Sequence, residues 1–417
     1  MIFIPSAEQR HAIEYGRTRE SIFSTTGPAG SGKTVLLEEM HSGMVQQGLR
    51  VAVCAPTGKA AKNITERTGI LGVTAHRLLE FPLPEEIAAA EKNGKPTKIS
   101  REPKRNRFNP LEYDAIFVDE YSMIPWKLHE YLVDAMPDDA FLRPFGDIQQ
   151  LKPVEPKENQ NRESPFEYML RTCPSIHLGK IWRNGDDIIS NGIRILKGQR
   201  PISNDHFFLI EENDPLKALE EWVDAHKDIG INYLSDPDCQ IITPSNKTPI
   251  GVLELNLHFM RKLYQKERSG WFHPPRHRWD KESGVMFRVG IKVVQAKNDY
   301  DTGVMNGETG TIIERTPDGD LLIDFGDRVV KYLYERTYLT PEGFERSVYP
   351  QADLDLGIVL STHKMQGGSA KHIIYVMGYE ARYAQGRSNL YTGITRTVET
   401  CAVITDNHAL MNSLSRE

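Results

Sequence analysis

The sequence of 417 residues has only four cysteines, no long run of apolar residues and no apolar leader at its start. Cys54, Cys173, Cys239 and Cys401 are far apart and form no CxxC pair, which argues against a disulfide framework and a structural zinc site. No segment reaches the roughly 20 apolar residues of a membrane-spanning helix, and residues 1–6 do not resemble a signal peptide. We therefore expect a protein of the reducing cytoplasm that has no membrane partner and no structural metal.

The sequence also lacks a large excess of charge of either sign. Lysine and arginine together number 51 and aspartate and glutamate 57, which gives a net charge of −6. A hydrophobic content of 39% and a charged content of 26% are typical of a globular protein with room for two domains. The small negative charge argues only mildly against a nucleic-acid partner, because the distribution of charge matters more than its sum.

Short apolar runs alternate with helical patterns in both halves of the chain, which predicts an α/β protein with two parallel-sheet domains. The pattern predicts a helix from the Gly-rich loop to about Gln46 and another ending near Glu267, with strands at 115–118, 239–242 and 356–360. We expect the first domain to comprise residues 1–80 plus 114–178, and the second residues 179–283 plus 350–417.

Two segments interrupt this rhythm and are predicted insertions. Residues 81–113 contain prolines, a short helical pattern near 85–91 and a basic stretch. Residues 284–349 contain short strands separated by tight turns such as Asn306-Gly307 and Asp318-Gly319, which predicts a small β-barrel.

A glycine-rich loop between a predicted strand and a predicted helix matches the pattern GxxxxGK[ST]. Its glycines let backbone N–H groups surround phosphates, the following helix directs its positive end at them, and the lysine reaches the outer phosphates. The threonine offers a hydroxyl to Mg²⁺. The loop consists of Gly27, Pro28, Ala29, Gly30, Ser31, Gly32, Lys33 and Thr34.

A second acidic site is needed for the metal, and the strand at 115–118 ends in two carboxylates. Asp119 can hold Mg²⁺, and Glu120 is placed to polarise the attacking water. Two acids after a strand are common on protein surfaces, so the pair indicates a hydrolysis site only in combination with a phosphate loop.

Three further residues are candidates for hydrolysis, although each has an ordinary alternative. Gln150 can contact the γ-phosphate or orient the water, or it is part of a strand-end turn. Arg183 and Arg396 can supply positive charge to the transition state, whereas most arginines are simply solvated.

The phosphate loop, the acid pair and several further segments, taken in chain order, resemble the motifs of the superfamily 1 helicases, in the class that contains RecD and Dda. The matching segments are Gln9, 27–34, 55–61, 74–79, 118–123, 146–154, Arg183, 361–367 and 390–397. The resemblance implies two RecA-like domains, a wedge-like insertion in the first and an SH3-like barrel in the second. It also implies adenine recognition by Gln9 and ATP hydrolysis with Mg²⁺. Translocation 5′-to-3′ on single-stranded DNA, unwinding of tailed duplexes, and replication or recombination proteins as partners follow from the same resemblance.

The nucleic-acid contacts are expected on both domains. Thr57 precedes a helix whose free N–H groups can hold a strand phosphate, and the other candidates rest on the resemblance. The set is Pro56, Thr57, Gly58, Lys59, His76, Arg77, Thr362, His363 and Lys364. Lys152, Asn184 and Met365 depart from the family's usual proline, glutamine and serine, which puts only nucleic-acid contacts in doubt.

Two basic stretches offset the overall acidity. Residues 92–107 carry a net charge of +6 in the first insertion, where related helicases carry the element that splits the duplex, and Phe81 or Phe108 can cap a base pair there. Residues 261–281 interleave basic residues with Trp271, Phe272 and Trp279, which either stack on bases or pack the barrel against its neighbour.

Three alternatives to a helicase remain at this point. A translocase that displaces proteins without strong unwinding would keep the ATPase. A P-loop kinase would turn over ATP regardless of nucleic acid, and would leave the second α/β domain unexplained. A binding module with an inactive site is disfavoured because Lys33 and both acids are present. The pathway, the oligomeric state and a preference for DNA over RNA do not follow from the residues themselves.

Overall fold

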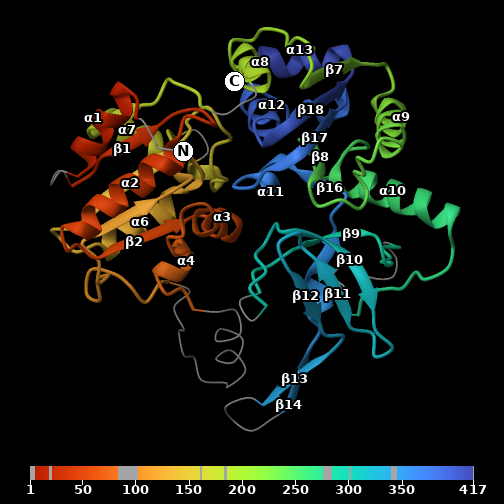
Figure 1. Ribbon diagram of the computed structural model, residues 1–417, viewed down its shortest axis with the longest axis horizontal. Helices are drawn as coiled ribbons and strands as arrows, with labels where there is room; N and C mark the ends of the chain where they lie inside the picture. The colour runs from red at the N-terminus through yellow and green to blue at the C-terminus, as the bar shows by residue number, and fades with distance from the viewer. Residues whose placement is uncertain are drawn as a thin grey trace. The chain divides into compact units, whose positions relative to one another are not determined.

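The computed structural model describes residues 5–17, 21–82, 102–159, 162–182, 186–275, 284–299, 302–339 and 345–416. The chain forms two compact units, Met1–Asn184 and Gly185–Glu417, and each is described by itself (Figure 1). The second unit was expected to begin at residue 179. It begins later because Gly179 and Trp182 donate backbone hydrogen bonds to Glu8 and Gly30 of the first unit.

The first unit is built on a six-stranded sheet in the order β3-β2-β4-β5-β1-β6, in which all pairs are parallel. Because β1 lies between β5 and β6, the strand order reverses beside it, and such a switch point is where open α/β sheets bind ligands. The strands are β1 (Ser24–Thr26), β2 (Val51–Ala55), β3 (Gly72–Thr74), β4 (Ala115–Val118), β5 (Phe141–Gly146) and β6 (Ser175–His177).

Helices cover both faces of this sheet. Successive residues of a strand point to opposite faces, so Phe117 packs with Leu36 and Met40 of α2, whereas Ile116 and Val118 join a core that includes residues of α6 and α7. The helices are α1 (Ala7–Gly16), α2 (Lys33–Gln46), α3 (Gly58–Thr68), α4 (Ala75–Leu78), α6 (Trp126–Ala135) and α7 (Pro165–Thr172), with 3-10 turns η1 (Tyr121–Met123) and η2 (Lys157–Asn159). The predicted helix from the loop to Gln46 is confirmed as α2.

A fully buried arginine fastens α1 to the central sheet. Arg143 of β5 has 0% exposure, and its Nε donates to the carbonyl of Gly16 at 2.9 Å. Its Nη1 also donates to the carbonyl of Leu142 at 3.0 Å. A cation at the C-terminal end of a helix is favourable because the last carbonyls carry partial negative charge. No local pattern around Arg143 predicts this role.

The second unit contains a five-stranded parallel sheet in the order β16-β8-β17-β18-β7. Its strands are β7 (Phe207–Glu211), β8 (Cys239–Thr243), β16 (Val359–Ser361), β17 (Ala370–Met377) and β18 (Thr397–Thr405). Its helices are α8 (Asp186–Leu196), α9 (Pro215–Lys227), α10 (Val252–Lys266), α11 (Thr362–Met365), α12 (Arg387–Ile394) and α13 (Asn407–Ser415), with η4 (Pro350–Asp353) and η5 (Tyr379–Ala381). The predicted helix ending near Glu267 is confirmed as α10.

An antiparallel sheet in the order β12-β11-β10-β9-β15 packs on the same unit. Its strands are β9 (Lys292–Gln295), β10 (Thr309–Arg315), β11 (Leu321–Asp324), β12 (Val329–Tyr332) and β15 (Leu354–Leu356). A separate two-stranded sheet pairs β13 (Arg336–Leu339) with β14 (Glu345–Val348). One apolar core includes Ile312 and Tyr332 of this sheet together with Ile241 of β8 and Phe259 of α10. Trp271 and Phe272 pack against this core, which favours the packing alternative for these two aromatics.

The predicted single strand over residues 356–360 is wrong. Leu356 ends β15 in the antiparallel sheet, and Val359 begins β16 in the parallel sheet. Gly357 lies at the crossing point, where a Cβ atom would come within 2.5 Å of the Val293 carbonyl carbon. The antiparallel sheet therefore extends beyond the expected limit at residue 349, because β15 pairs with β9.

The outer edge of β16 is closed by a side chain instead of another strand. Asn256 of α10 is 4% exposed, its Nδ2 donates to the Val359 carbonyl at 2.8 Å, and its Oδ1 accepts the Val359 N–H at 3.0 Å. On the inner side, Gln240 Nε2 donates to the carbonyls of Gly357 and Ile358 at 3.3 and 3.0 Å. Both contacts fix the strand that leads into α11.

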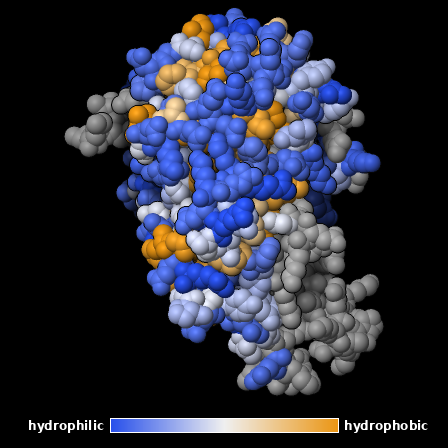
Figure 2. Space-filling view, turned by 90° about the vertical axis from the view of Figure 1, so that its right-hand side faces the viewer, coloured by the Kyte–Doolittle hydropathy of each residue, from blue (hydrophilic) through white to orange (hydrophobic). Residues whose placement is uncertain are grey.

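Among the described residues, no helix is long and apolar enough to cross a membrane. The four cysteines are free thiols, and three of them are buried. On the face shown in Figure 2, hydrophilic residues predominate and hydrophobic residues form separate patches. The predicted short helix near 85–91 and most of the basic stretch 92–107 lie outside the described residues.

Candidate nucleotide site and nucleic-acid interface

The phosphate loop links β1 to α2 at the switch point of the first unit. Gly30 and Gly32 have φ angles of +77° and +85°, which only glycine adopts without strain. Gly27 donates its N–H to the Gly146 carbonyl at the end of β5, at 3.2 Å. The loop therefore has the backbone shape and the neighbouring strand end that phosphate binding requires.

Lys33, the first residue of α2, folds over this loop. Its Nζ donates to the carbonyls of Gly27 at 2.7 Å and Pro28 at 3.0 Å. Neutral carbonyls are weaker partners for an ammonium group than an anion. A phosphate bound by the loop would therefore compete well for this cation.

Gln9 lies against the loop from α1. It is 1% exposed and takes part in a capping box with Ser6, whose N–H it accepts at 2.9 Å. Its Nε2 is 3.4 Å from the Ser31 carbonyl, and a Cβ on Gly32 would lie 2.7 Å from it. The structure thus places the predicted adenine-reading residue in contact with the predicted phosphate loop.

The two predicted acids follow β4 at the same edge of the sheet. Burial and the neighbouring Glu120 charge raise the pKa of Asp119 to about 6, while Lys33 opposes this shift. Asp119 Oδ1 also accepts the N–H of Glu120 at 2.9 Å. Glu120 has φ +52° and ψ 39°, a left-handed conformation that costs about 1–3 kcal/mol in a residue with a side chain. Such strain is often found at functional sites.

The oxygen donors present suit Mg²⁺. Asp119 offers a half-buried carboxylate, whose loss of water a bound cation would offset, and Thr34 supplies a hydroxyl from the first turn of α2. Among the described residues, no group of three or more His, Cys, Asp or Glu side chains forms an all-protein metal cage. Mg²⁺ held by one carboxylate, a hydroxyl and nucleotide phosphates fits this donor set.

Gln150 follows β5 and is 4% exposed. Its Nε2 is 3.4 Å from Asp147 Oδ2, while its Oε1 is buried without a hydrogen-bond partner among the described residues. A buried unsatisfied carbonyl costs about 1–3 kcal/mol. This is what a residue that accepts a hydrogen bond from a bound water or ligand would show.

The structure reveals one supporting residue that sequence reasoning missed. Pro125 precedes α6 and offers no side-chain cap, so Glu155 caps the helix instead by accepting the Trp126 N–H at 2.7 Å. Trp126 Nε1 also donates to the Glu163 carbonyl at 2.8 Å. These bonds tie the segment after Glu120 to the segment after Gln150. No local pattern signals a cap from 29 residues away.

The two predicted arginines differ from the other candidates. Arg183 lies outside the described residues. Arg396 follows α12, is 7% exposed, and its Nε is 3.4 Å from the Thr392 carbonyl of its own helix. In this conformation the Arg396 side chain is folded back on α12.

The nucleic-acid candidates of the first unit lie in two loops with the same design. Thr57 caps α3 by accepting the Ala60 N–H at 3.2 Å, and Thr74 caps α4 by accepting the Arg77 N–H at 3.1 Å. Pro56, Gly58 and Lys59 flank the first cap. His76 and Arg77 are exposed beside the second cap, where the His76 ring is 4.9 Å from that of Phe81.

The candidates of the second unit surround α11 in the same way. Ser361 caps this helix by accepting the Lys364 N–H at 3.2 Å. His363 is exposed, and Lys364 Nζ lies 4.0 Å from Asp355 Oδ2. Thr362 is fully buried, with its hydroxyl 3.5 Å from the Thr243 carbonyl, so only its backbone is placed for a phosphate.

Two departures from the family pattern have structural explanations. Lys152 forms an ion pair with Glu167 at 2.9 Å, so its charge is partly used within the first unit. Met365 is 2% exposed and packs in the core of the second unit, which replaces a hydroxyl contact by apolar packing.

Comparison with known proteins gives consistent results. Residues 9–156 match a family model described as an AAA domain. The chain is 27% identical over 399 residues to the ATP-dependent RecD2 DNA helicase of Deinococcus radiodurans, covering 94% of this chain and 48% of that protein. It is 24% identical over 454 residues to the RecBCD enzyme subunit RecD of Mycobacterium tuberculosis, covering 98% and 71%. It is also 26% identical to the ATP-dependent DNA helicase dda of Enterobacteria phage T4, covering 47% of this chain and 46% of that protein.

Solved structures share the fold over almost the whole chain. The Pif1 helicase of Bacteroides in complex with ADP-AlF3 and single-stranded DNA has a TM-score of 0.59 and 19% identity, with 99% of this chain and 94% of that chain covered. The Pif1 helicase of Candida albicans has a TM-score of 0.56 and 20% identity, with 99% and 97% covered. The chain spans about half the length of the Deinococcus relative. The chain is thus similar over most of its length to the helicase RecD2 and to the subunit RecD, and it shares its fold with the Pif1 helicases.

Proposed function

We propose that this protein is an ATP-dependent DNA helicase that moves 5′-to-3′ on single-stranded DNA and unwinds duplexes. The observation that carries the proposal is the convergence on one sheet edge of Lys33, Asp119-Glu120 and the unsatisfied Gln150 oxygen, with Gln9 against the same loop. The relatives named as ATP-dependent DNA helicases support it.

In this proposal the loop N–H groups and Lys33 hold the nucleotide phosphates. Glu120 polarises the attacking water, and Gln150 Oε1 orients it or contacts the γ-phosphate. Mg²⁺, held by Thr34 and Asp119, would neutralise charge on the β- and γ-phosphates. Arg183 and Arg396 are proposed to stabilise the transition state. For Arg396 the terminal guanidinium nitrogens would make this contact, while Nε faces the Thr392 carbonyl.

The finer domain assignment is also a proposal. Residues 1–80 plus 114–182 would form a first RecA-like domain with 81–113 as a duplex-splitting insertion. Residues 186–283 plus 357–416 would form the second, and 284–356 an SH3-like insertion extended to the end of β15. Strand contacts would come from the caps at Thr57, Thr74 and Ser361 and from neighbouring basic groups, on both domains.

The ATPase rate with and without single-stranded DNA or RNA tests the motor. Single-stranded DNA should raise the rate, and Glu120→Gln should abolish hydrolysis while nucleotide binding remains, because it removes the base but keeps the size of the side chain. Failure of both kinds of strand to stimulate the wild type would refute the motor assignment and favour a phosphotransferase.

A pair of tailed duplexes tests the polarity. The duplex with a 5′ single-stranded tail should be unwound, whereas the duplex with a 3′ tail should remain intact. The reverse outcome would contradict the polarity but leave the ATPase assignment standing. Replication or recombination proteins are proposed as partners, as the resemblance to RecD implies.

The alternative is a translocase that displaces proteins without strong unwinding. The side chain of Phe108 is 90% exposed. This exposure favours the helicase, because the ring can contact a base pair. Phe81 does not have this freedom, since its ring packs against His76 and Tyr131.

A further inference from the structure

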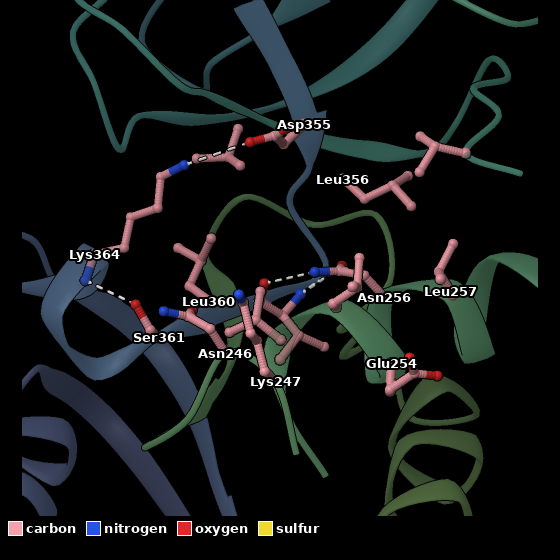
Figure 3. Close-up of a pocket in the computed structure, with 15 residues that line it drawn as sticks. Asn246, Lys247, Glu254, Asn256, Leu257, Asp355, Leu356, Leu360, Ser361 and Lys364 are labelled. Carbon is pink, nitrogen blue, oxygen red and sulfur yellow. Dashed lines mark hydrogen bonds and ion pairs between the residues drawn. The ribbon is translucent and has the colours of Figure 1, made fainter. Parts of the chain in front are cut away.

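The second unit contains a cavity of about 630 Å³ between α10, the antiparallel sheet and the start of α11 (Figure 3). This is within the size range of small-ligand pockets, roughly 300–1,000 Å³. None of the motifs matched in the sequence accounts for it as a whole, since only Ser361 and Lys364 of its lining belong to them.

The interior of this cavity is aliphatic. Val252, Leu253 and Leu257 line it from α10, and Val294 and Leu356 line it from the antiparallel sheet. Leu257 and Leu356 are each 6% exposed, so the walls belong to the packed core and are not a mobile surface. Such walls favour an apolar, compact group over a charged one.

The rim of the cavity is polar and carries two lysines, Lys247 and Lys364, beside two carboxylates, Asp355 and the exposed Glu254. Lys364 extends from α11 toward Asp355 of β15, and the two side chains form an ion pair at 4.0 Å (Figure 3). Lys247 and Asn246 approach from the exposed loop after β8. An occupant with an apolar body and an anionic attachment therefore matches both parts of the site.

Ser361 and Lys364 belong both to this rim and to the candidate strand-binding segment at α11. A strand phosphate attracted by Lys364 would place the base of the same nucleotide at the mouth of the cavity. The base is the uncharged part of a nucleotide, and the phosphate is its anionic attachment. Continuity with the candidate strand-binding segment at α11 thus selects one occupant, a nucleotide of the strand already proposed as the substrate.

We propose that the cavity receives one nucleobase of the tracked single strand, while Lys364 and Lys247 hold the flanking phosphates. Asn246 lies on the same rim, where its amide can donate to or accept from the edge of any base. The inference rests on the proposed function, because it names how that substrate is held. Since the walls are aliphatic, the site accepts every base and gives grip without sequence specificity.

Base removal tests this directly. The probe is a tailed DNA duplex, whose junction fixes the register, with a single abasic site moved along the 5′ tail. In the wild-type protein, an abasic site at one tail position should weaken binding more than an abasic site at the neighbouring positions. The expected loss at that position is roughly tenfold, which corresponds to about 1.4 kcal/mol. All phosphates remain in place, so the loss reports on the base alone.

Variants that fill the cavity should remove this effect. Val252 and Leu253 are both half-buried on its α10 wall, so Val252→Trp and Leu253→Trp can each be accommodated by taking up the cavity space. Each should bind the intact tail as the wild type binds the tail with the critical abasic site, and each should show no position dependence. Val329→Trp, on β12 at 53% exposure and outside the cavity, should keep the wild-type profile.

The results separate the two proposals. Uniform weakening along the tail, or the same position dependence in wild type and both filled variants, overturns the base pocket but leaves a DNA-stimulated ATPase standing. A different occupant, such as a protein segment, predicts this uniform profile. No binding of any DNA overturns the base pocket together with the proposed function. Circular dichroism shows whether each variant folds. Because Val252→Trp and Leu253→Trp are separate substitutions, either one can test the pocket if the other does not fold.

Discussion

Replacement of the buried Arg143 by methionine should destabilise the first unit and weaken nucleotide binding together. Methionine keeps much of the length of arginine but cannot donate to the Gly16 carbonyl, which is buried at the end of α1. Because Gln9 lies on the same helix and touches the phosphate loop, a loosened α1 should raise the KM for ATP more than it lowers kcat.

The magnitude follows from two opposing effects. Each hydrogen bond from a charged donor contributes about 1.5–3 kcal/mol, and Arg143 donates to both Gly16 and Leu142. Removal of the cation also relieves its burial, which costs several kcal/mol per ion. Since the Gly16 carbonyl would remain buried and unsatisfied, we expect a net loss of about 2–4 kcal/mol.

Urea unfolding followed by circular dichroism measures this loss. The transition of the first unit is identified as the one that ATP shifts, because a ligand stabilises the unit that binds it. Arg10→Met is the matched control, since Arg10 is an exposed arginine on α1 whose guanidinium donates to the Pro5 carbonyl at the start of the chain segment, at 2.9 Å, and not to a buried helix end. An Arg143→Met protein as stable as the control would refute the reasoning and show that an apolar replacement compensates for the buried cation.

Two of the three remaining predictions concern DNA, and the third concerns stability. Phe108→Ala should slow unwinding several-fold with little change in the DNA-stimulated ATPase rate, measured on the same tailed duplex; an equal loss of both activities would argue against a separating role. Asp355→Asn should tighten single-stranded DNA binding about two- to fivefold at low salt, because it frees Lys364 from a partly exposed ion pair worth at most about 1 kcal/mol; fluorescence anisotropy that shows weaker binding would contradict this. Glu155→Gln should keep the Trp126 hydrogen bond largely intact, whereas Glu155→Ala should lower the unfolding free energy by about 1 kcal/mol, as loss of a helix cap does, and equal thermal stability of the two variants would refute the capping role.

Much of the nucleotide site was predictable because its residues act through local patterns. The loop at 27–34 needs glycines at fixed spacing, and the acids at 119–120 end an apolar strand whose bounds, 115–118, are confirmed. The loop and the acids are thus encoded within a few residues of the elements that carry them.

The parts that could not be predicted depend on neighbours far away in the sequence. An apolar run such as 356–360 contains no signal that Gly357 separates two sheets, because the division is imposed by the Val293 backbone. In the sequence, Arg143 resembles any solvated arginine of a strand, because its contact with the end of α1 is not visible in the local pattern. The cap that Glu155 supplies to α6 is equally non-local.

The closed edge of β16 has a consequence for solubility. A strand at the border of a sheet normally presents free N–H and C=O groups that another chain can pair with, which is a route to aggregation. Asn256 occupies this position by offering one donor and one acceptor to Val359, so the border imitates a paired strand without adding one. The same side chain that steadies the approach to α11 therefore also occupies the Val359 groups with which a strand of another copy would pair.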